Sequence, residues 1–394
     1  MLVNVSVDEL LDQERIRASI EHIGRKKRCA GVDKIDSRDL YDYWEKNGAT
    51  ICLDIRKGRY HPAPFRKLRI PKSDGSGFRT LEIPCAVDRM LQYALHNLLN
   101  PHYDPTFSEC SYGFRKGRSC IHAIEQGRKF IADGYDWILH LDIKGFFDNV
   151  NHSILMRQIE EEIQDKALVS LIRFYVQPRV MNGIHYYKKY AGLSQGSALS
   201  PLLSNIYLNR LDQYLEQNGW LFVRYADDVL VFIDGYLKAS DALKKIRCFL
   251  NDELRLLLNQ KKTMICKNYD TSFLGYSYTN SITNHSGIGI TMSNKARKRL
   301  KDKMNKILLQ KCGDHKNWWK RLGGLNRGWI NYYKYADRED MVSFLTHIDD
   351  IQAEGVYQRL RSEPDGGKAF MAAFFKTRSY SSLMELYRGY IKHV

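Results

Sequence analysis

Hydrophobic positions between about residues 136 and 280 follow two patterns, short apolar runs typical of strands and longer amphipathic stretches typical of helices. The run DWILHLDI (136–143) predicts a buried strand, and LFVRYADDVLVFI (221–233) predicts two strands joined by a short polar turn. A further strand is predicted for TSFLGYSYT (271–279). Helices are predicted for NHSILMRQIEEEI (151–163), SPLLSNIYLNRLDQYLEQNG (200–219) and SDALKKIRCFLNDELRLLL (240–258).

The segments on either side differ in character. Residues 1–135 mix helical patterns with a basic stretch, 56–84, whose Pro and Gly residues indicate short strands and a turn. A strongly basic helix is predicted from Lys295 to Lys320, followed by aromatic-rich helical segments. Strands followed by helices in this order indicate an α+β fold with a palm-like centre and a helical C-terminal domain. The expected domains are 1–135, 136–285 and 286–394.

Length and composition limit the classes of protein to which the chain can belong. The 394 residues are 44% hydrophobic and 27% charged, a globular composition that calls for two or three domains. No apolar run approaches the roughly 18 residues of a membrane span, and the N-terminus becomes acidic and amphipathic at once, unlike a signal peptide. Eight cysteines without a C-x-x-C pair argue against a zinc ribbon and against a disulfide framework. We therefore expect a cytoplasmic protein.

Charge points to a polyanionic partner. The formal net charge is +16, and residues 335–394 hold eight Lys or Arg against nine Asp or Glu, so the excess lies in the first 334 residues. Basic surfaces of this strength serve nucleic acid or anionic membranes. Charge alone leaves both partners open.

Two adjacent aspartates, Asp227 and Asp228, stand at the tip of the predicted hairpin. Aspartate is common in turns, but two neighbouring carboxylates repel each other unless a cation neutralises them. Asp142 ends another predicted strand 85 residues earlier, so pairing of the two strands could bring three carboxylates together. Such a hard-oxygen site suits Mg²⁺ or Mn²⁺ rather than zinc. Two ions could clamp an attacking 3′-hydroxyl and a leaving pyrophosphate, which points to nucleotide polymerisation.

A set of motifs occurs in order along the chain, and together it resembles the reverse transcriptases encoded by bacterial group II introns and their free-standing relatives. The resemblance runs from about Gly31 to about Lys334. It implies a right-hand polymerase of α+β class, with fingers, a palm that contains an antiparallel sheet, and a helical thumb. The motifs are AGVDKID, LRIPKSDGSGFRTLEIPCAVDRMLQYAL, SYGFRKGRS, LDIKGFFDNVNH, GLSQGSALSPLLSNIYLNRLD, YADD, LLNQKKT, FLGYSY and LNRGWINYYKYA.

The resemblance implies roles for particular residues. Asp142, Asp227 and Asp228 would be catalytic and would bind two Mg²⁺ ions, or Mn²⁺, together with the backbone carbonyl of Ile143. Phe146 stands where the family places a steric gate against the ribose 2′-hydroxyl; the alternative is a core ring. The expected contacts to the incoming dNTP are Lys72, Arg79, Phe146, Gln195, Gly196 and Lys262.

Nucleic-acid contacts are expected from two further places. The motif SYGFRKGRS contributes Arg115 and Arg118. The basic helix would grip the backbone of template and primer as a thumb, a contact independent of sequence and sensitive to salt. Its expected contacts are Lys295, Arg297, Lys298, Arg299 and Lys301. FLGYSY resembles the primer-grip hairpin, although its aromatic residues also suit plain sheet packing.

The chain departs from intron-encoded proteins in ways that bear on its biological role. It has Ser194-Gln195-Gly196 where those proteins usually have Pro-Gln-Gly. After GWINYY the sequence becomes acidic and soon ends, where a basic extension and often an endonuclease are usual. These differences favour a free-standing enzyme that copies a dedicated structured noncoding RNA, as similar proteins do in antiviral defence or beside CRISPR adaptation genes.

Two classes of function stay open at this stage. One is an RNA-directed DNA polymerase whose partners are an RNA template, a DNA primer or product, and dNTPs; it could also prime its own synthesis from a tyrosine or serine hydroxyl. The other is an intron maturase or an RNA-binding scaffold with little polymerase role. The three aspartates favour the polymerase. Oligomeric state is left open.

Overall fold

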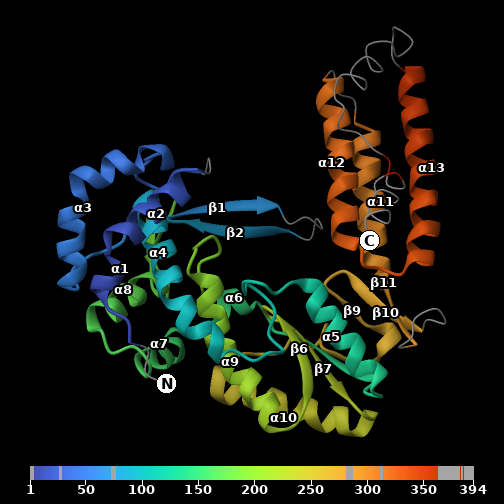
Figure 1. Cartoon of the computed structure of the whole chain (residues 1–394), viewed down its shortest axis with the longest axis horizontal. Helices are drawn as coiled ribbons and strands as arrows, with labels where there is room; N and C mark the ends of the chain where they lie inside the picture. Colours follow the sequence, from blue (N-terminus) through green and yellow to red (C-terminus); the bar gives the residue numbers. More distant parts are fainter. Residues whose placement is uncertain are drawn as a thin grey trace. The chain divides into compact units, whose positions relative to one another are not determined.

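The computed structural model describes residues 4–25, 29–71, 77–280, 287–310 and 314–362, together with 382 and 385. The chain divides into two compact units. The first consists of Met1–Ala123 and Leu139–Ile265, and the second of Ile124–Ile138 and Cys266–Val394. Each unit is described by itself below (Figure 1).

The first unit contains a helical region built around α4, most of whose residues are buried. Side chains cap several of these helices: Ser6 precedes α1, Asp12 precedes α2, and Asp165 precedes α8, each accepting a backbone N–H of the first turn. The elements are α1 (Val7–Leu10), α2 (Gln13–Gly24), η1 (Ser37–Asp39), α3 (Leu40–Arg56), α4 (Ala86–Tyr103), η2 (Asp104–Thr106), α7 (His152–Glu160) and α8 (Lys166–Val176).

A four-stranded sheet of the first unit has the order β2-β1-β4-β5. The predicted basic stretch 56–84 supplies the hairpin at one edge, in which Arg69 pairs with Thr80, and β4 joins β1 in parallel. The edge hairpin of β4 and β5 is antiparallel, with Val180 opposite Tyr187. The strands are β1 (Phe65–Pro71), β2 (Phe78–Ile83), β4 (Arg179–Asn182) and β5 (His185–Lys188).

The second sheet has the order β6-β7-β3-β8 and includes the predicted Asp-Asp hairpin. Its strands β6 and β7 are antiparallel and largely buried, as the apolar runs on both sides of the aspartates require. Helix α9 contacts β6 and helix α10 contacts β7. The elements are β3 (Trp137–Asp142), α6 (Phe146–Asn149), α9 (Ser200–Gln217), β6 (Leu221–Tyr225), β7 (Asp228–Ile233), α10 (Tyr236–Leu254) and β8 (Met264–Lys267).

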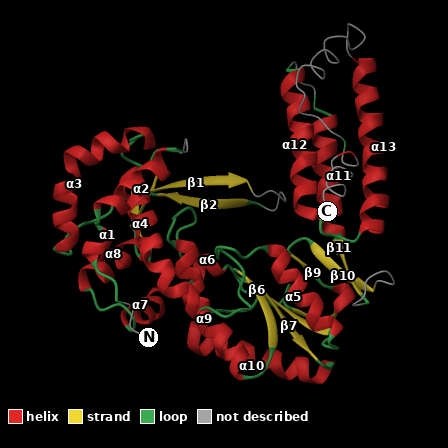
Figure 2. Cartoon of the chain, in the orientation of Figure 1, coloured by secondary structure: helices red, strands yellow, loops and turns green. Residues whose placement is uncertain are grey.

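The second unit combines a small antiparallel sheet, of order β11-β10-β9, with a helical bundle in which α11 packs against both α12 and α13 (Figure 2). Most of α5 also belongs to it. The elements are α5 (Cys120–Ala132), η3 (Asn268–Asp270), β9 (Ser272–Phe273), β10 (Tyr276–Asn280), β11 (Ile288–Met292), α11 (Asn294–Leu308), α12 (His315–Tyr333) and α13 (Arg338–Ser362).

Two predicted elements of the second unit prove to be divided. The single strand expected at 271–279 is two strands, because Leu274 and Gly275 both adopt positive φ and turn the chain between them. The single helix expected from Lys295 to Lys320 is two helices, since α11 ends at Leu308 and α12 begins at His315. Among the described residues, no helix combines the length and the apolar character that crossing a membrane demands.

Candidate polymerase active site

The paired aspartates lie where the sequence predicts, at the tip of the β6–β7 hairpin. Tyr225 pairs with Asp228 across the hairpin, which leaves Ala226 and Asp227 as the turn. Ala226 has a φ of 58°, a left-handed conformation that an L-residue adopts at some cost. Neighbouring structure must therefore hold this turn.

The loop that contains SYGFRKGRS supplies part of that support. Arg224 and this loop exchange backbone hydrogen bonds, from Arg224 N–H to the Cys110 carbonyl and from Tyr112 N–H to the Arg224 carbonyl, each 2.8 Å. Gly113 passes so close that a Cβ there would meet the Ala226 nitrogen at 2.3 Å. Only glycine permits this approach between loop and hairpin.

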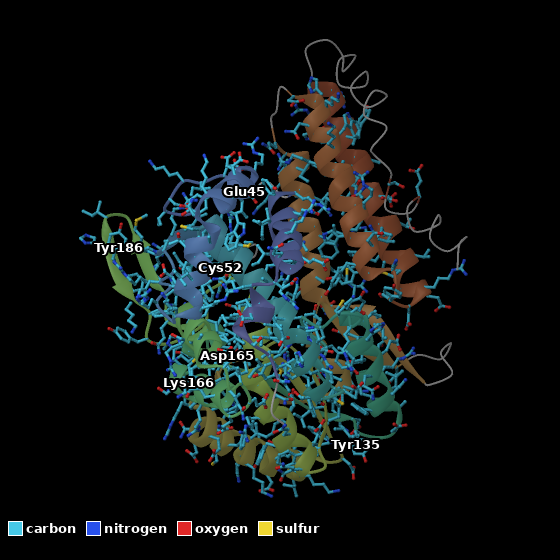
Figure 3. All side chains as sticks on the ribbon, turned by 60° about the vertical axis from the view of Figure 1, so that its left-hand side comes forward. Glu45, Cys52, Tyr135, Asp165, Lys166 and Tyr186 are labelled. Carbon is cyan, nitrogen blue, oxygen red and sulfur yellow. The ribbon has the colours of Figure 1, made fainter. Side chains whose placement is uncertain are left out.

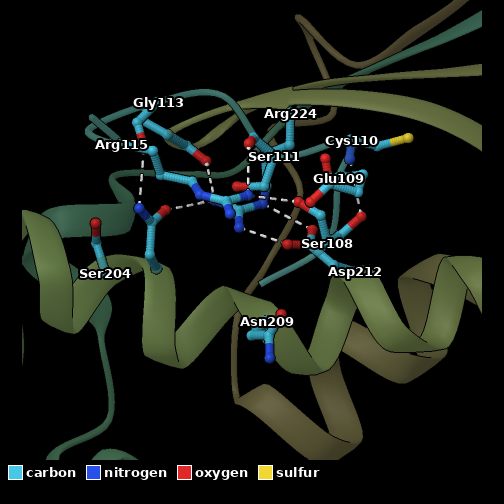
Figure 4. Close-up of polar contacts among 12 residues, drawn as sticks. Ser108, Glu109, Cys110, Ser111, Gly113, Arg115, Ser204, Asn209, Asp212 and Arg224 are labelled. Carbon is cyan, nitrogen blue, oxygen red and sulfur yellow. Dashed lines mark hydrogen bonds and ion pairs between the residues drawn. The ribbon is translucent and has the colours of Figure 1, made fainter. Parts of the chain in front are cut away.

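The side chain of Arg224 completes the support from within the protein (Figure 4). Its Nε and Nη2 donate to the two carboxylate oxygens of Asp212 on α9, at 2.7 and 2.5 Å. Its Nη1 donates to Asn205 Oδ1 at 2.9 Å and to the Ala226 carbonyl at 3.1 Å. Asn205 in turn donates to the Gly113 carbonyl at 2.9 Å. A fully buried network thus ties the Ala226–Asp227 turn to α9 and to the loop.

The third aspartate comes from the neighbouring strand. Asp142 is the last residue of β3, which lies beside β7 in the sheet. Lys262 Nζ lies 3.4 Å from Asp142 Oδ2, and the Asp142 N–H donates to Thr263 Oγ1 at 3.2 Å. His140, on the same strand, places Nε2 2.7 Å from Asp228 Oδ1. The structure therefore places Lys262, which was expected to contact the nucleotide, beside Asp142, and it places His140 beside Asp228.

The electrostatic environment of Asp227 disfavours its negative charge. Burial raises the pKa of Asp227, and the negative charges of Asp228 and Asp142 raise it further. Within the described ranges, no three His, Cys, Asp or Glu side chains converge as a ready-made metal site. The carboxylate oxygens nevertheless suit a hard divalent cation. To bind it, Asp142 would give up its contact with Lys262, and Asp228 would give up its contact with His140.

The expected nucleotide contacts fall in several places. The Gln195 carbonyl accepts the Glu82 N–H at 2.9 Å, which links the 194–196 loop to β2. Gly196 has a φ of +114°, and a Cβ there would lie 3.3 Å from the Glu82 carbonyl oxygen, so a larger residue would be strained. Arg79 is exposed on β2. Lys72 lies outside the described residues.

The structure buries Phe146, the residue expected to act as a steric gate. Its ring is 1% exposed and packs against Phe147 and Tyr207, which supports the alternative of a core ring. The next residue, Phe147, is only partly buried. The backbone of α6 turns the two rings in different directions, and this orientation could not be read from two adjacent phenylalanines in the sequence.

Arg115 differs from the expected surface contact. Its guanidinium is buried and donates to the Asp104 carboxylate at 2.8 Å and to the carbonyls of Ser108 and Ser111. It therefore holds the loop together. Arg118 also forms an ion pair close to home in the sequence, with Nη2 2.6 Å from Glu109 Oε2, although its side chain is more exposed than that of Arg115.

The cations of α11 divide into two groups. Lys295, Lys298 and Arg299 are exposed. Arg297 instead pairs with Asp340 on α13 and donates to the Met292 carbonyl at 3.0 Å, so it packs within the bundle. Lys301 is half-buried, with Nζ 3.2 Å from His347 Nε2.

Sequence reasoning missed the Arg224–Asp212 pair, Asn205 and His140. Arg224 stands inside the apolar run LFVRYADD, and a charged residue in a predicted buried strand signals a buried partner. His140 similarly interrupts WILHLD. The identity of each partner could not be inferred, because Asp212 and Asp228 come from other elements.

Comparison with known proteins agrees with this geometry. Residues 70–278 match the model of the family described as reverse transcriptase (RNA-dependent DNA polymerase). This span covers both sheets of the first unit from the end of β1 onward, with all three aspartates and the Arg224 network. The chain belongs to the reverse transcriptase family and is of the group II intron-like kind.

Two curated relatives illustrate that kinship. The group II intron-encoded protein LtrA of Lactococcus lactis subsp. cremoris is 26% identical over 76% of this chain, which spans 65% of the length of LtrA. Protein YkfC of Escherichia coli (strain K12) is 30% identical over 60% of this chain and 71% of YkfC. The solved structure of the Sicinivirus 3Dpol RNA dependent RNA polymerase matches with a TM-score of 0.52 at 13% sequence identity. The match covers 78% of this chain and 66% of the polymerase chain, and it shows the α+β polymerase fold alone.

Proposed function

We propose that the protein is an RNA-directed DNA polymerase that transfers dNTPs to a 3′-hydroxyl with two Mg²⁺ ions, Mn²⁺ being the alternative. One observation carries the proposal: Asp142 and Asp228 end and begin adjacent strands, with Asp227 in the turn between β6 and β7. Burial, and after it the negative charges of Asp228 and Asp142, raise the pKa of Asp227, and bound cations would offset this cost of ionising it.

Each part of the site then has a task. Asp142, Asp227, Asp228 and the Ile143 carbonyl would hold the ions, which supply charge stabilisation to the entering and leaving oxygens when bound. Lys262 neutralises Asp142 before cations arrive. Lys72, Arg79, Gln195 and Gly196 are proposed to contact the dNTP, as cations and a close-packed backbone do for a triphosphate and a base.

The larger divisions of the chain are proposed to follow the right-hand plan. Residues 1–135 would form the N-terminal extension and fingers, 136–285 the palm, and 286–394 the thumb and C-terminal segment. The exposed cations of α11 suit a sequence-independent grip on template and primer. Phe147, which is partly exposed, is a better candidate for the steric gate than the buried Phe146.

The biological role is a finer proposal. The acidic sequence after Tyr335 supports a free-standing enzyme that copies a dedicated structured noncoding RNA in a bacterial antiviral defence system, and the cytoplasm is where such an RNA and dNTPs meet. The intron-encoded name of LtrA favours the alternative, a reverse transcriptase or maturase of an intron. An RNA-binding scaffold is the remaining alternative.

One experiment separates these roles. RNA and DNA that co-purify with the full chain are sequenced beside the variant Asp227→Asn Asp228→Asn, while both proteins are tested for Mg²⁺-dependent primer extension. We expect extension and DNA complementary to one structured RNA with the wild type only. Intron RNA would favour the maturase. Equal RNA binding without templated DNA in either protein would favour the scaffold and contradict the polymerase.

A further inference from the structure

The edge hairpin of β4 and β5, residues 179–190 and hereafter the tyrosine hairpin, exposes several large side chains. Ile184, Tyr186, Tyr187 and Tyr190 are 85%, 55%, 40% and 79% exposed. In Figure 3, the hairpin that carries Tyr186 stands out from the body of the first unit. Exposed aromatic groups gathered on one element mark a surface that meets a partner.

Cations lie over three of these rings. Each of three tyrosines has a charged group over its ring at 5.5 to 6.0 Å; the pairs are Lys67 with Tyr187, Arg179 with Tyr186, and Lys188 with Tyr190. Residues 179–190 contain three Lys or Arg and no Asp or Glu. The surface is therefore both aromatic and positive, and an acidic or polyanionic partner complements it.

A cavity of about 330 Å³ lies at the base of the tyrosine hairpin. Its lining includes Tyr187 and Tyr190 from the hairpin and Gln195 from the loop next to the proposed nucleotide site. Two carboxylates, Glu82 and Asp148, also line it beside Lys67, Lys188 and Lys189. Lys189 Nζ meets the Glu82 carboxylate at 2.9 Å, and Ser194 donates to it at 2.6 Å. Ligand pockets begin near about 300 Å³, so this space suits one unstacked base with its sugar.

We propose that the tyrosine hairpin binds unpaired RNA. Bases would stack on Tyr186, Tyr187 and Tyr190, since every base has a π-face and aromatic stacking tolerates any sequence. The neighbouring cations would meet the phosphates between the stacked bases. Because the cavity extends to Gln195, a strand lying on the hairpin leads toward the polymerase site. RNA is favoured over an acidic protein because it offers both a π-face for each exposed ring and a phosphate for each exposed cation.

This inference deepens the proposed function by adding a binding surface for single-stranded RNA outside the three aspartates, and it can be tested without catalysis. The affinity of the full chain for a fluorescent, unstructured oligoribonucleotide is measured by anisotropy in the absence of dNTPs. For Tyr186→Ala Tyr190→Ala, we expect the Kd to rise about tenfold or more, because two bases lose the rings on which they stack. Tyr186→Phe Tyr190→Phe keeps the rings and should bind within about twofold of the wild type.

The control is Tyr41→Ala Tyr236→Ala, which removes two tyrosines of similar exposure, 53% and 51%, on other elements of the same unit. It should bind RNA as the wild type does. Wild-type affinity in the Tyr186→Ala Tyr190→Ala variant would overturn the proposal. An equal loss of affinity in the phenylalanine and alanine variants would also overturn it. Thermal unfolding of every variant shows whether a loss of binding reflects a loss of folding.

Two sources of the RNA are distinguished by a second comparison. Binding of a primer–template duplex is measured with and without an unpaired 5′ extension of the template, and then with a separate single-stranded RNA. An effect of the tyrosines only with the extension identifies the template; an effect with the separate RNA identifies a second RNA. If the wild type extends no primer yet tyrosine-dependent binding persists, the polymerase proposal fails and the hairpin proposal stands.

Discussion

The guanidinium of Arg224 forms a fully buried bidentate ion pair with the carboxylate of Asp212, and the same guanidinium donates to the Ala226 carbonyl in the turn before Asp228. This connects helix α9 to the strained turn that positions Asp227. Buried charges of this kind are expensive to separate, since the remaining partner stays without compensation in a dry environment.

Removing one partner of the pair is expected to destabilise the first unit and to slow DNA synthesis. Arg224→Gln and Asp212→Asn should each lower the free energy of unfolding by about 3–5 kcal/mol. The double variant should lose less than the sum, because no lone charge is left. Urea unfolding measures this coupling, and primer extension should show a reduced kcat with a smaller change in the KM for dNTP.

The exposed pair Arg210–Glu161 is the matched control, with both side chains about half exposed. Arg210→Gln should change stability by no more than about 1 kcal/mol. Additive losses for Arg224→Gln and Asp212→Asn would contradict the coupling, and full activity in Arg224→Gln would contradict the positioning role.

Sugar selection is expected to depend on Phe147 rather than on Phe146. Phe147→Val should raise the incorporation of NTPs relative to dNTPs by roughly tenfold or more, because a smaller side chain leaves room for the 2′-hydroxyl. Phe146→Ala empties part of the core and should cost about 3–5 kcal/mol of stability without changing sugar preference. Single-nucleotide incorporation with both substrates decides between them; a change of preference in Phe146→Ala alone would restore the original assignment.

Asp88, a buried aspartate of α4, predicts a pH dependence of stability. Asp88 accepts hydrogen bonds from the hydroxyls of Tyr60 and Tyr175, at 2.8 and 3.2 Å, yet burial raises its pKa to about 7. Between about pH 4 and pH 7 the folded chain keeps a proton that the unfolded chain has released. The free energy of unfolding should therefore fall as pH rises through this window, by up to about 4 kcal/mol, and level off above it.

Asp88→Asn should remove this contribution, because the amide does not titrate. Chemical unfolding between pH 4 and 8 compares the variant with the wild type and with Asp252→Asn, a substitution at an exposed position of α10. The control should follow the wild-type curve. Identical slopes for Asp88→Asn and the wild type would show that Asp88 is ionised in the folded protein.

The cations of α11 should separate into binding and structural residues. Lys298→Ala Arg299→Ala should weaken binding to primer–template and reduce the slope of log K against log salt by about two, one for each lost phosphate contact. Arg297→Ala should leave the salt slope unchanged and destabilise the bundle, because it loses Asp340 and the Met292 carbonyl. A salt titration beside thermal unfolding measures both effects. A reversed pattern would remove the proposed grip from this face.

The local pattern of apolar and polar residues was sufficient to locate many strands and helices of this protein. Apolar runs broken by polar turns locate β3, β6 and β7, and amphipathic periods locate α7, α9 and α10, since burial of one face imposes those periods. The same runs place Asp142 at a strand end and Asp227 in a turn. The ordered motifs were enough to indicate the family, because each stands in a separate short stretch.

Tertiary structure decided which of these residues meet. Strand β3 lies beside β7 although 85 residues separate Asp142 from Asp227, and such long-range pairing leaves no trace in local periodicity. It also turned Phe146 inward, bound Arg115 to Asp104, and buried Arg224 against Asp212. The sequence shows where a charged or aromatic residue occurs, but the tertiary structure determines its partner. The reason is that the free-energy cost of burying such a side chain depends on the groups that the fold places around it.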